Sequence, residues 1–249
     1  MAIEYFKLDH GIAHVLLNRP ERMNALDVAS KAALGRIWQE IAADPSIHVV
    51  VLSGAGEKAF CVGSDIKEMQ ATGEMVDTDT LMNAIPDIGI RLDKPVIAAL
   101  HGFTVGMGMT LALHSDLRIA ARNTKIAWPE TKHGVLSAVS AVNLAGVVGE
   151  AAALDLMLTA RTIDAEEALK IGLVHRVVDG PVLAAALEWA RALTKNSPLA
   201  MQLTKSLILT ERRRRTTDHA GFIAQTRSDV ARSEEFGDIV AKVPGAGRI

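Results

Sequence analysis

The segment Lys58-Ala59-Phe60-Cys61-Val62-Gly63-Ser64-Asp65-Ile66 comes shortly after an apolar run, Val49-Val50-Val51-Leu52. A second segment of the same kind, His101-Gly102-Phe103-Thr104-Val105-Gly106-Met107-Gly108-Met109, follows Pro95-Val96-Ile97-Ala98-Ala99-Leu100. Continuous apolar runs of this length predict strands that are covered on both faces. A glycine-punctuated turn after each strand can direct one backbone N–H toward a shared carbonyl oxygen. The two segments therefore indicate an oxyanion hole built from main-chain donors.

One carboxylate follows the second segment, in Trp128-Pro129-Glu130. An oxyanion hole combined with one acid/base group can form and quench an enolate. Glu130 could instead cap a turn or pair with Lys132, but the two glycine-punctuated segments favour the acid/base role. His133 lies nearby in the sequence, where a solvent-facing turn histidine is the simpler interpretation.

Composition excludes several classes of protein. The chain has 249 residues, of which 49% are hydrophobic and 22% charged, and its formal net charge is -2. This balance predicts no nucleic-acid or membrane partner. The single cysteine, Cys61, fits a reducing compartment and is expected to be a buried small hydrophobe. Residues 1–9 lack the apolar core of a signal peptide, and glycines interrupt residues 95–113, so we expect a soluble cytoplasmic protein.

Periodicity predicts strand–helix alternation in the first half of the chain and helices in the second. Strands are expected at 2–8, 12–18, 49–52, 96–100, 117–121, 125–127 and 174–177. Helices are expected at 28–43, 80–92, 106–114, 137–147, 150–158, 165–170, 181–195, 198–210 and 214–232, with a mobile loop at 70–79. Asp27 is the expected N-cap of the first helix. The break at Asn196-Ser197-Pro198 predicts a core of residues 1–196 and a helical region of residues 197–249, packed on the core or on a neighbouring subunit.

Several motifs, in this order, resemble the crotonase (enoyl-CoA hydratase/isomerase) superfamily. They are Asn18-Arg19-Pro20-Glu21-Arg22-Met23-Asn24-Ala25-Leu26, the two glycine-punctuated segments, Arg161-Thr162-Ile163-Asp164-Ala165-Glu166-Glu167-Ala168 and Ile171-Gly172-Leu173-Val174. The resemblance implies an α/β fold with a ββα-superhelix core and a helical C-terminal trimerisation region. It also implies an acyl-CoA substrate, with no cofactor or metal because coenzyme A belongs to the substrate, and a homotrimer or homohexamer.

The resemblance also assigns roles to particular residues. Ser64 and Met107 would supply the two oxyanion N–H groups, and Glu130 would be the acid/base. The residues expected to contact the acyl-CoA are Arg22, Met23, Ala25, Val62, Gly63, Asp65, Ile66, Phe103, Gly106, Thr110 and Pro129. Asp65 could also cap the helix that follows it.

One departure from the family pattern concerns the reaction. Typical hydratases carry a second glutamate where this chain has Thr110, and two carboxylates suit the addition of water. A buried threonine that bonds back to its own helix is the expected role of Thr110. Hydration of an enoyl-CoA in fatty acid metabolism is the first expectation. Isomerisation, enolate C–C bond formation or cleavage, and thioester hydrolysis remain open.

Two readings from other classes also remain open. Ser64 could be a hydrolase nucleophile, although its surroundings are not those of a nucleophile elbow. The run Arg212-Arg213-Arg214-Arg215 could contact RNA in a non-catalytic binding protein. A solvated helix face is the more common explanation of such a run, and the net charge does not favour nucleic acid.

Overall fold

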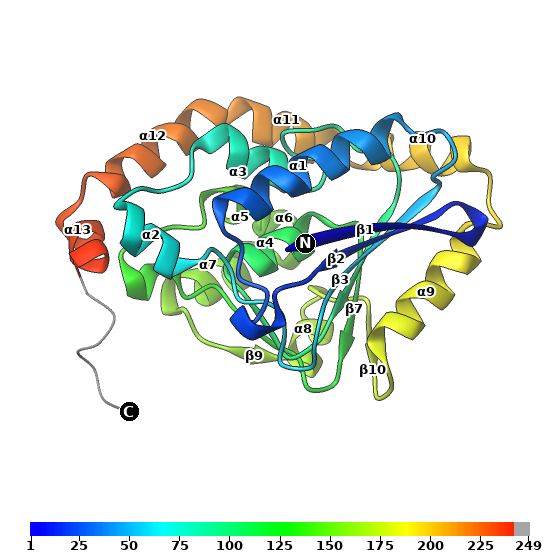
Figure 1. The fold of residues 1–249 in the computed structure, drawn as a ribbon, viewed down its shortest axis with the longest axis horizontal. Coiled ribbons are helices and arrows are strands. Elements are labelled where there is room, and N and C mark those ends of the chain that lie inside the picture. The colour runs from blue at the N-terminus through cyan, green and yellow to red at the C-terminus, as the bar shows by residue number, and fades with distance from the viewer. Residues whose placement is uncertain (242–249) are drawn as a thin grey trace.

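The computed structural model describes residues 1–241 and contains two β-sheets. The larger has six strands in the order β1-β2-β3-β5-β7-β10 (Figure 1). Their bounds are β1 Ile3–Leu8, β2 Ile12–Leu17, β3 Val49–Gly54, β5 Val96–Leu100, β7 Leu117–Ala121 and β10 Arg176–Val178. β1 is antiparallel to β2, and the other pairs are parallel. Every residue of β5 is buried, as its uninterrupted apolar sequence predicts.

The smaller sheet has the order β4-β6-β8-β9. Its strands are β4 Ala59–Cys61, β6 Phe103–Val105, β8 Lys125–Ala127 and β9 Ile163–Asp164. The chain alternates between the sheets and then enters a helix. β3 leads through β4 to α2 (Ile66–Thr72), and β5 leads through β6 to α4 (Met107–His114). β7 leads through β8 to the 3-10 helix η3 (Glu130–His133) and then to α5 (Ala138–Asn143). This repeated strand–strand–helix unit is the α/β superhelix that the motifs predicted.

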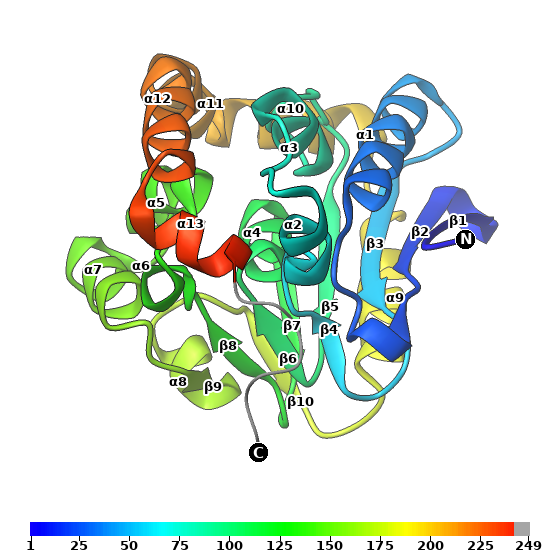
Figure 2. The same ribbon diagram turned by 60° about the vertical axis from the view of Figure 1, so that its left-hand side comes forward.

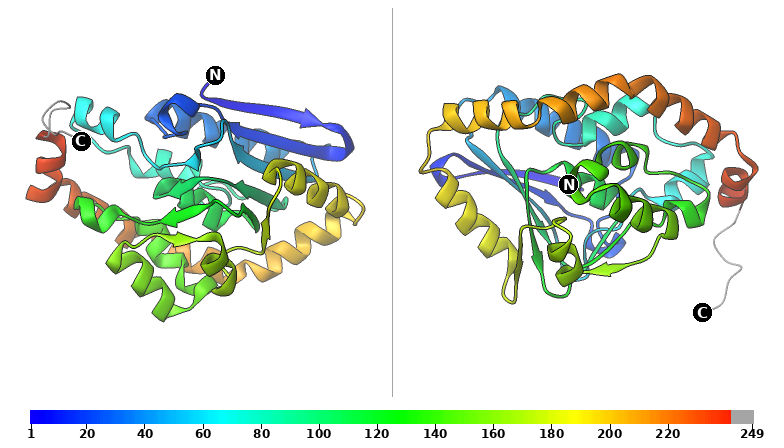
Figure 3. Two further views of the ribbon diagram at one scale, coloured as in Figure 1. Left: turned by 90° about the horizontal axis from the view of Figure 1, so that it is seen from below. Right: turned by 180° about the vertical axis from the view of Figure 1, so that it is seen from behind.

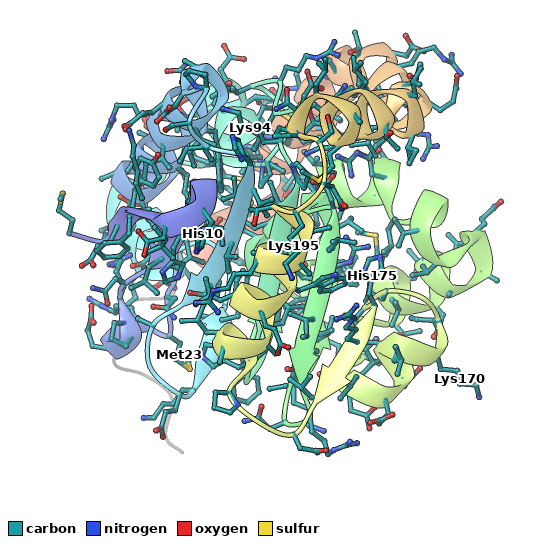
Figure 4. All side chains as sticks on the ribbon, turned by 90° about the vertical axis from the view of Figure 1, so that its right-hand side faces the viewer. His10, Met23, Lys94, Lys170, His175 and Lys195 are labelled. Carbon is teal, nitrogen blue, oxygen red and sulfur yellow. The ribbon has the colours of Figure 1, made fainter. Side chains whose placement is uncertain are left out.

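Helices cover both faces of the larger sheet. On one face, α9 (Val182–Leu193) packs against β3, β5 and β7, and Figure 4 shows it lying across these strands. On the other face lies the main core, which includes Trp38 of α1 (Val28–Ala43) and packs α1 against α3 (Thr78–Ala84). Asp27 caps α1 as predicted, because its Oδ1 accepts the Ser30 N–H at 2.7 Å.

The C-terminal helices run in series along one side of the molecule (Figure 3). They are α10 Pro198–Ile208, α11 Thr210–Asp218, α12 Ala220–Ala231 and α13 Glu234–Ala241. α11 and α12 pack on α5, and α13 contacts α2 and η3, so that α13 lies between α5 and α2 in Figure 2. Residues 242–249 of the predicted 197–249 region lie outside the described residues.

The remaining short elements complete the chain between these layers. They are η1 Asp9–Gly11, η2 Pro20–Arg22, α6 Ala145–Val148, α7 Glu150–Thr159 and α8 Ala165–Lys170. The helix predicted at 137–147 is divided into α5 and α6, and the one at 214–232 is divided between α11 and α12.

Two sequence predictions are wrong around α3. The helix expected at 80–92 ends at Ala84, because Ile85 precedes a proline and adopts an extended conformation. The loop expected at 70–79 is shorter, since α2 continues to Thr72 and Asp77 caps α3 by accepting the Thr80 N–H.

The arginine run is also not a simple solvated face. Arg212 and Arg213 of α11 form ion pairs with Asp87, whose carboxylate is completely buried. Arg213 also pairs with Asp93 at 2.7 Å. Arg214 is the exposed member and pairs with Glu211 of its own helix. The first two arginines therefore attach α11 to the segment after α3.

Candidate active site

The two glycine-punctuated segments meet at Gly63. This residue has a φ of +106°, and a Cβ built on it would lie 3.3 Å from the Val105 carbonyl and 3.4 Å from the Met107 nitrogen. The carbonyl of Gly63 accepts the Leu26 N–H at 2.8 Å, and the Leu26 carbonyl accepts the Asp65 N–H at 2.9 Å. These bonds attach the first segment to Leu26, and the close approach at Gly63 places it beside the start of α4.

Two main-chain donors are left without a partner at this junction. Ser64 lies between the two residues that bond Leu26, and its own N–H donates to no group among residues 1–241. Met107 is the first residue of α4, where an N–H has no intrahelical acceptor. Two free N–H groups, one at a helix N-terminus, form the donor pair that an oxyanion hole requires.

Glycine is required for the second segment to approach this closely. Gly106 has φ +56° and ψ −124°, a conformation that side-chain-bearing residues avoid. A Cβ on Gly108 would lie 2.2 Å from the Cys61 carbonyl oxygen. Cys61 itself is completely buried, and burial raises the pKa of its thiol to about 12. It is the inert small hydrophobe that the sequence predicted.

Glu130 directs its carboxyl group toward the same junction. A Cβ on Gly106 would be 3.1 Å from Glu130 Oε1, and Oε2 is buried with no hydrogen-bond partner among the described residues. Burial raises the pKa of Glu130 to about 7, while its own N–H and the Ser137 hydroxyl favour the carboxylate and oppose this shift. A carboxyl group that titrates near neutrality is suited to take up and return a proton. Lys132 donates to the Ala160 carbonyl and not to Glu130.

A cluster of hydroxyl groups lies where a second carboxylate would be expected. Thr110 Oγ1 is 3.2 Å from the Gly106 carbonyl, which confirms the predicted bond to its own helix. The same oxygen is 3.2 Å from Ser137 Oγ and 2.9 Å from Ser140 Oγ. Ser137 thus connects Glu130 to a short chain of hydroxyls that joins α4 to α5.

One cavity contains most of the residues predicted for the site. Those that line it are Val62, Gly63, Ser64, Ile66, Gly106, Met107, Thr110, Pro129 and Glu130. Those that do not line it are Arg22, Met23, Ala25, Asp65 and Phe103. His133 also lines the cavity, although it is exposed.

Four of the residues outside the cavity lie on the turn at 20–25 or on β6, and the fifth, Asp65, lies just before α2. Met23 is 40% exposed on this turn, and Figure 4 shows its position relative to α9. Phe103 is 48% exposed on β6. Asp65 caps α2 through the Lys67 N–H and accepts a hydrogen bond from Arg19 at 3.1 Å, so its carboxylate is already engaged.

Sequence reasoning missed the residues that hold this turn. Asn24 has a φ of +58° and donates to the carbonyls of Ala55 and Ala59. Arg19 donates to the Ala25 carbonyl at 2.7 Å and bridges to Asp65. Both residues lie in the motif that begins at Asn18. Their partners are either distant in the sequence or are main-chain atoms, so no local sequence pattern indicates these hydrogen bonds.

Two cations in the cavity were also missed. Lys31 is 2% exposed, and Arg227 of α12 is half-buried. Lys31 had a signal in the sequence, because it is three residues before Leu34 and seven before Trp38, on the apolar face of the first helix. Arg227 had none, since its place in the cavity depends on how α12 packs.

Comparison with known proteins agrees with this geometry. The family model described as "Enoyl-CoA hydratase/isomerase" matches residues 7–236. The chain belongs to the enoyl-CoA hydratase/isomerase family. It is therefore an enzyme that acts on an acyl-CoA thioester, with the crotonase fold that its motifs predicted.

Individual family members cover most of the chain. An (E)-benzylidenesuccinyl-CoA hydratase of Thauera aromatica is 40% identical over 80% of this chain and 79% of its own length. A short-chain-enoyl-CoA hydratase of Clostridium acetobutylicum is 37% identical over 79% of this chain and 77% of its own length. The solved structure of a carnitinyl-CoA dehydratase from Mycobacterium avium 104 superimposes with a TM-score of 0.84 at 31% identity, covering 95% of this chain and 94% of that one.

Residues 1–241 of this chain hold neither a candidate membrane-spanning helix nor a cluster of metal-ligating side chains. Their helices are each too short or too polar to cross a membrane. No group of three or more His, Cys, Asp or Glu side chains among them is arranged to hold a metal ion.

Proposed function

We propose that the enzyme adds water reversibly across the double bond of a 2-enoyl-CoA, with Glu130 as its one acid/base. The observation that carries this proposal is the position of the Glu130 carboxyl group. Its Oε2 is buried and has no hydrogen-bond partner among the described residues, and its Oε1 lies close to Gly106, next to the free N–H groups of Ser64 and Met107. The thioester carbonyl would accept those two hydrogen bonds, and the water would lie at Glu130.

One carboxyl group can carry out both proton transfers of hydration. The carboxylate of Glu130 takes a proton from water as the water oxygen bonds to the β-carbon. The electron pair of the double bond then moves onto the thioester, and its negative oxygen is stabilised by the N–H groups of Ser64 and Met107. Each such donor contributes about 3–4 kcal/mol in comparable sites. The enolate collapses by taking the same proton from Glu130 at the α-carbon, which regenerates the carboxylate.

The hydroxyls of Ser137 and Thr110 support this assignment. They line the cavity beside Glu130 and can hydrogen-bond a water molecule that a second glutamate would otherwise hold. The proposal therefore needs neither a second carboxylate nor a cofactor or metal.

The deciding experiment follows the absorbance of the conjugated thioester of a short trans-2-enoyl-CoA. Wild type is expected to consume it, and Glu130→Gln to lose at least about 100-fold in kcat because the proton carrier is removed. Glu188→Gln, on the exposed face of α9, is the matched control and should retain full activity. Tight binding without turnover by wild type would refute hydration.

Isomerisation of the double bond is the second candidate. One carboxyl group beside an oxyanion hole is sufficient to move a proton between the α- and γ-carbons. Thr110 in place of a second carboxylate, bonded to its own helix, is the observation that favours it. A 3-enoyl-CoA offered to wild type distinguishes the two, because an isomerase would form the conjugated thioester and a pure hydratase would not.

We further propose that the CoA arm runs past the turn at 20–25, outside the acyl cavity. The exposed Arg22 and Met23 and the buried Ala25 of this turn would lie along the nucleotide and pantetheine, with Asp65 shaping the turn through Arg19. Phe103, exposed on β6, would contact the same arm. A raised KM for Arg22→Gln without a change in kcat would support this placement.

The proposed enzyme works in the cytoplasm as a homotrimer or a homohexamer, with residues 197–249 at or near the subunit contacts. The exposed leucines of α10, Leu199, Leu203 and Leu207, support this proposal because an apolar helix face of this kind favours a partner. Light scattering should give a trimer or hexamer mass for wild type. Leu203→Glu should lower that mass, and Thr204→Glu on the same helix is the control.

A further inference from the structure

A lysine occupies a core position of α1, next to the first oxyanion donor. The ammonium of Lys31 donates to the Leu26 carbonyl at 2.8 Å. That carbonyl also accepts the N–H of Asp65, the residue after Ser64. The charge of Lys31 therefore lies beside the backbone of Ser64, inside the cavity that Glu130 also lines.

This ammonium has donors that the protein does not use. A lysine has three N–H donors, and the bond to Leu26 accounts for one among the described residues. Lys31 takes part in none of the ion pairs of residues 1–241. Burial lowers its pKa to about 8, so it remains largely charged at neutral pH. A buried charge without a partner is unfavourable, which leaves a strong demand for an anion.

A second cation enters the cavity from the opposite end of the chain. Arg227 donates from Nε to Thr78 Oγ1 at 3.2 Å and from Nη2 to the Val76 carbonyl at 2.5 Å. These bonds fix the guanidinium against the start of α3. Its remaining N–H donors have no partner among the described residues, and a guanidinium carries five in all.

The carboxylates on the cavity wall do not neutralise these cations directly. Glu68 Oε2 accepts the Val28 N–H at 2.8 Å, at the start of α1, and Glu74 is exposed. Neither forms an ion pair within 4.0 Å of Lys31 or Arg227 among the described residues. Glu68 is nevertheless close enough to favour the charged form of Lys31.

We propose that the acyl group of the substrate carries a carboxylate of its own, which binds Lys31, with Arg227 as the second cation. The substrate is then the CoA monothioester of a short unsaturated dicarboxylic acid. The chain is short because Lys31 lies beside Ser64, where the thioester carbonyl binds, so the second carboxylate is only a few bonds from the first carbonyl. This inference rests on the proposed hydratase function.

The test compares two five-carbon thioesters, glutaconyl-CoA and trans-2-pentenoyl-CoA, which differ by a carboxylate in place of a methyl group. Wild type should prefer glutaconyl-CoA in kcat/KM. Lys31→Met keeps an unbranched side chain, shorter by one atom, and removes its charge. We expect it to lower kcat/KM for glutaconyl-CoA by about 30-fold or more, and that for 2-pentenoyl-CoA by less than about threefold. Lys67→Met, exposed on α2, should change neither.

The outcomes separate this inference from the proposed function. The carboxylate site is wrong, and hydration stands, if wild type hydrates the two thioesters with equal kcat/KM. The same conclusion follows if Lys31→Met lowers kcat/KM equally for both. If neither thioester is hydrated but calorimetry shows that glutaconyl-CoA binds more tightly and loses this advantage in Lys31→Met, the carboxylate site stands and the hydratase proposal falls.

Discussion

Gly106 and Glu130 approach each other closely: a Cβ built on Gly106 would lie only 3.1 Å from Glu130 Oε1. The contact joins the two halves of the site, because Gly106 precedes the free N–H of Met107 and Glu130 begins η3. The absence of a side chain at Gly106 therefore sets the distance between the proposed oxyanion donor and the proposed acid/base. Activity should be sensitive to any atom inserted there.

Gly106→Ala is expected to reduce kcat sharply while the protein still folds. The added methyl group presses on the Glu130 carboxyl group, and the backbone at φ +56°, ψ −124° becomes strained by about 1–3 kcal/mol. Enoyl-CoA kinetics and a thermal melt measure the two effects. Gly221→Ala is the matched control, since a Cβ there meets no atom within 4 Å. Equal kcat in the two variants would contradict the proposed role of this contact.

The rate of hydration should depend on the ionisation of Glu130. Its pKa is raised to about 7 by burial, and the proposed mechanism starts from the carboxylate. We expect kcat/KM to rise with pH through about 7 and then level off. A profile that is flat between pH 5 and 8 would count against Glu130 as the base.

The same group should make stability depend on pH. In the folded protein the pKa of Glu130 is raised above its ordinary value of 4.5, so its contribution is fully favourable below that value and is lost as the pH rises through about 7. Glu130→Gln removes this dependence. Relative to wild type, the variant should gain at most about 3 kcal/mol in free energy of unfolding between pH 4.5 and 8. Urea denaturation at both pH values tests this, and a constant difference would refute it.

Neighbouring arginines of α11 should differ in their effect on stability. Arg213→Ala removes one of the two arginines that pair with the buried Asp87 carboxylate. The free energy of unfolding should fall by about 3 kcal/mol or more. Arg214→Ala removes exposed pairs with Glu211 and Asp218 and should reduce stability far less. Urea denaturation of the two variants gives both values. Similar losses would mean that the pair with Asp87 does not attach α11 to the core.

Local sequence signals accounted for much of the fold. The apolar runs before the glycines became the buried strands β3 and β5, and Asp27 and Asp65 cap the helices they precede. β4, β6 and β9 were missed because strands of two or three residues are too short to show an alternating pattern, although β8, of three residues, was predicted. The end of α3 was also missed, although Pro86 marked it.

The chemistry of the site was less predictable than its backbone. Gly63, Gly106 and Glu130 line one cavity, as the sequence predicted, because glycine turns and short motifs can be recognised from neighbouring residues. The charge environment was not, because Lys31 and Arg227 come from α1 and α12, which are almost two hundred residues apart. The inward pairing of Arg213 was missed for the same reason, since Asp87 is distant in the sequence.

The hydroxyl of Ser137 gives the most selective test of the acid/base assignment. This hydroxyl favours the charged form of Glu130, so its removal in Ser137→Ala should raise the pKa of Glu130 further. The midpoint of the pH–rate profile should then move to higher pH. Ser140→Ala is the control, because Ser140 contacts Thr110 Oγ1 at 2.9 Å and is not among the groups that shift Glu130. A merely structural role for Ser137 would lower kcat at every pH and leave the midpoint unchanged. A midpoint that moves only in Ser137→Ala would place the titrating group of the reaction at Glu130.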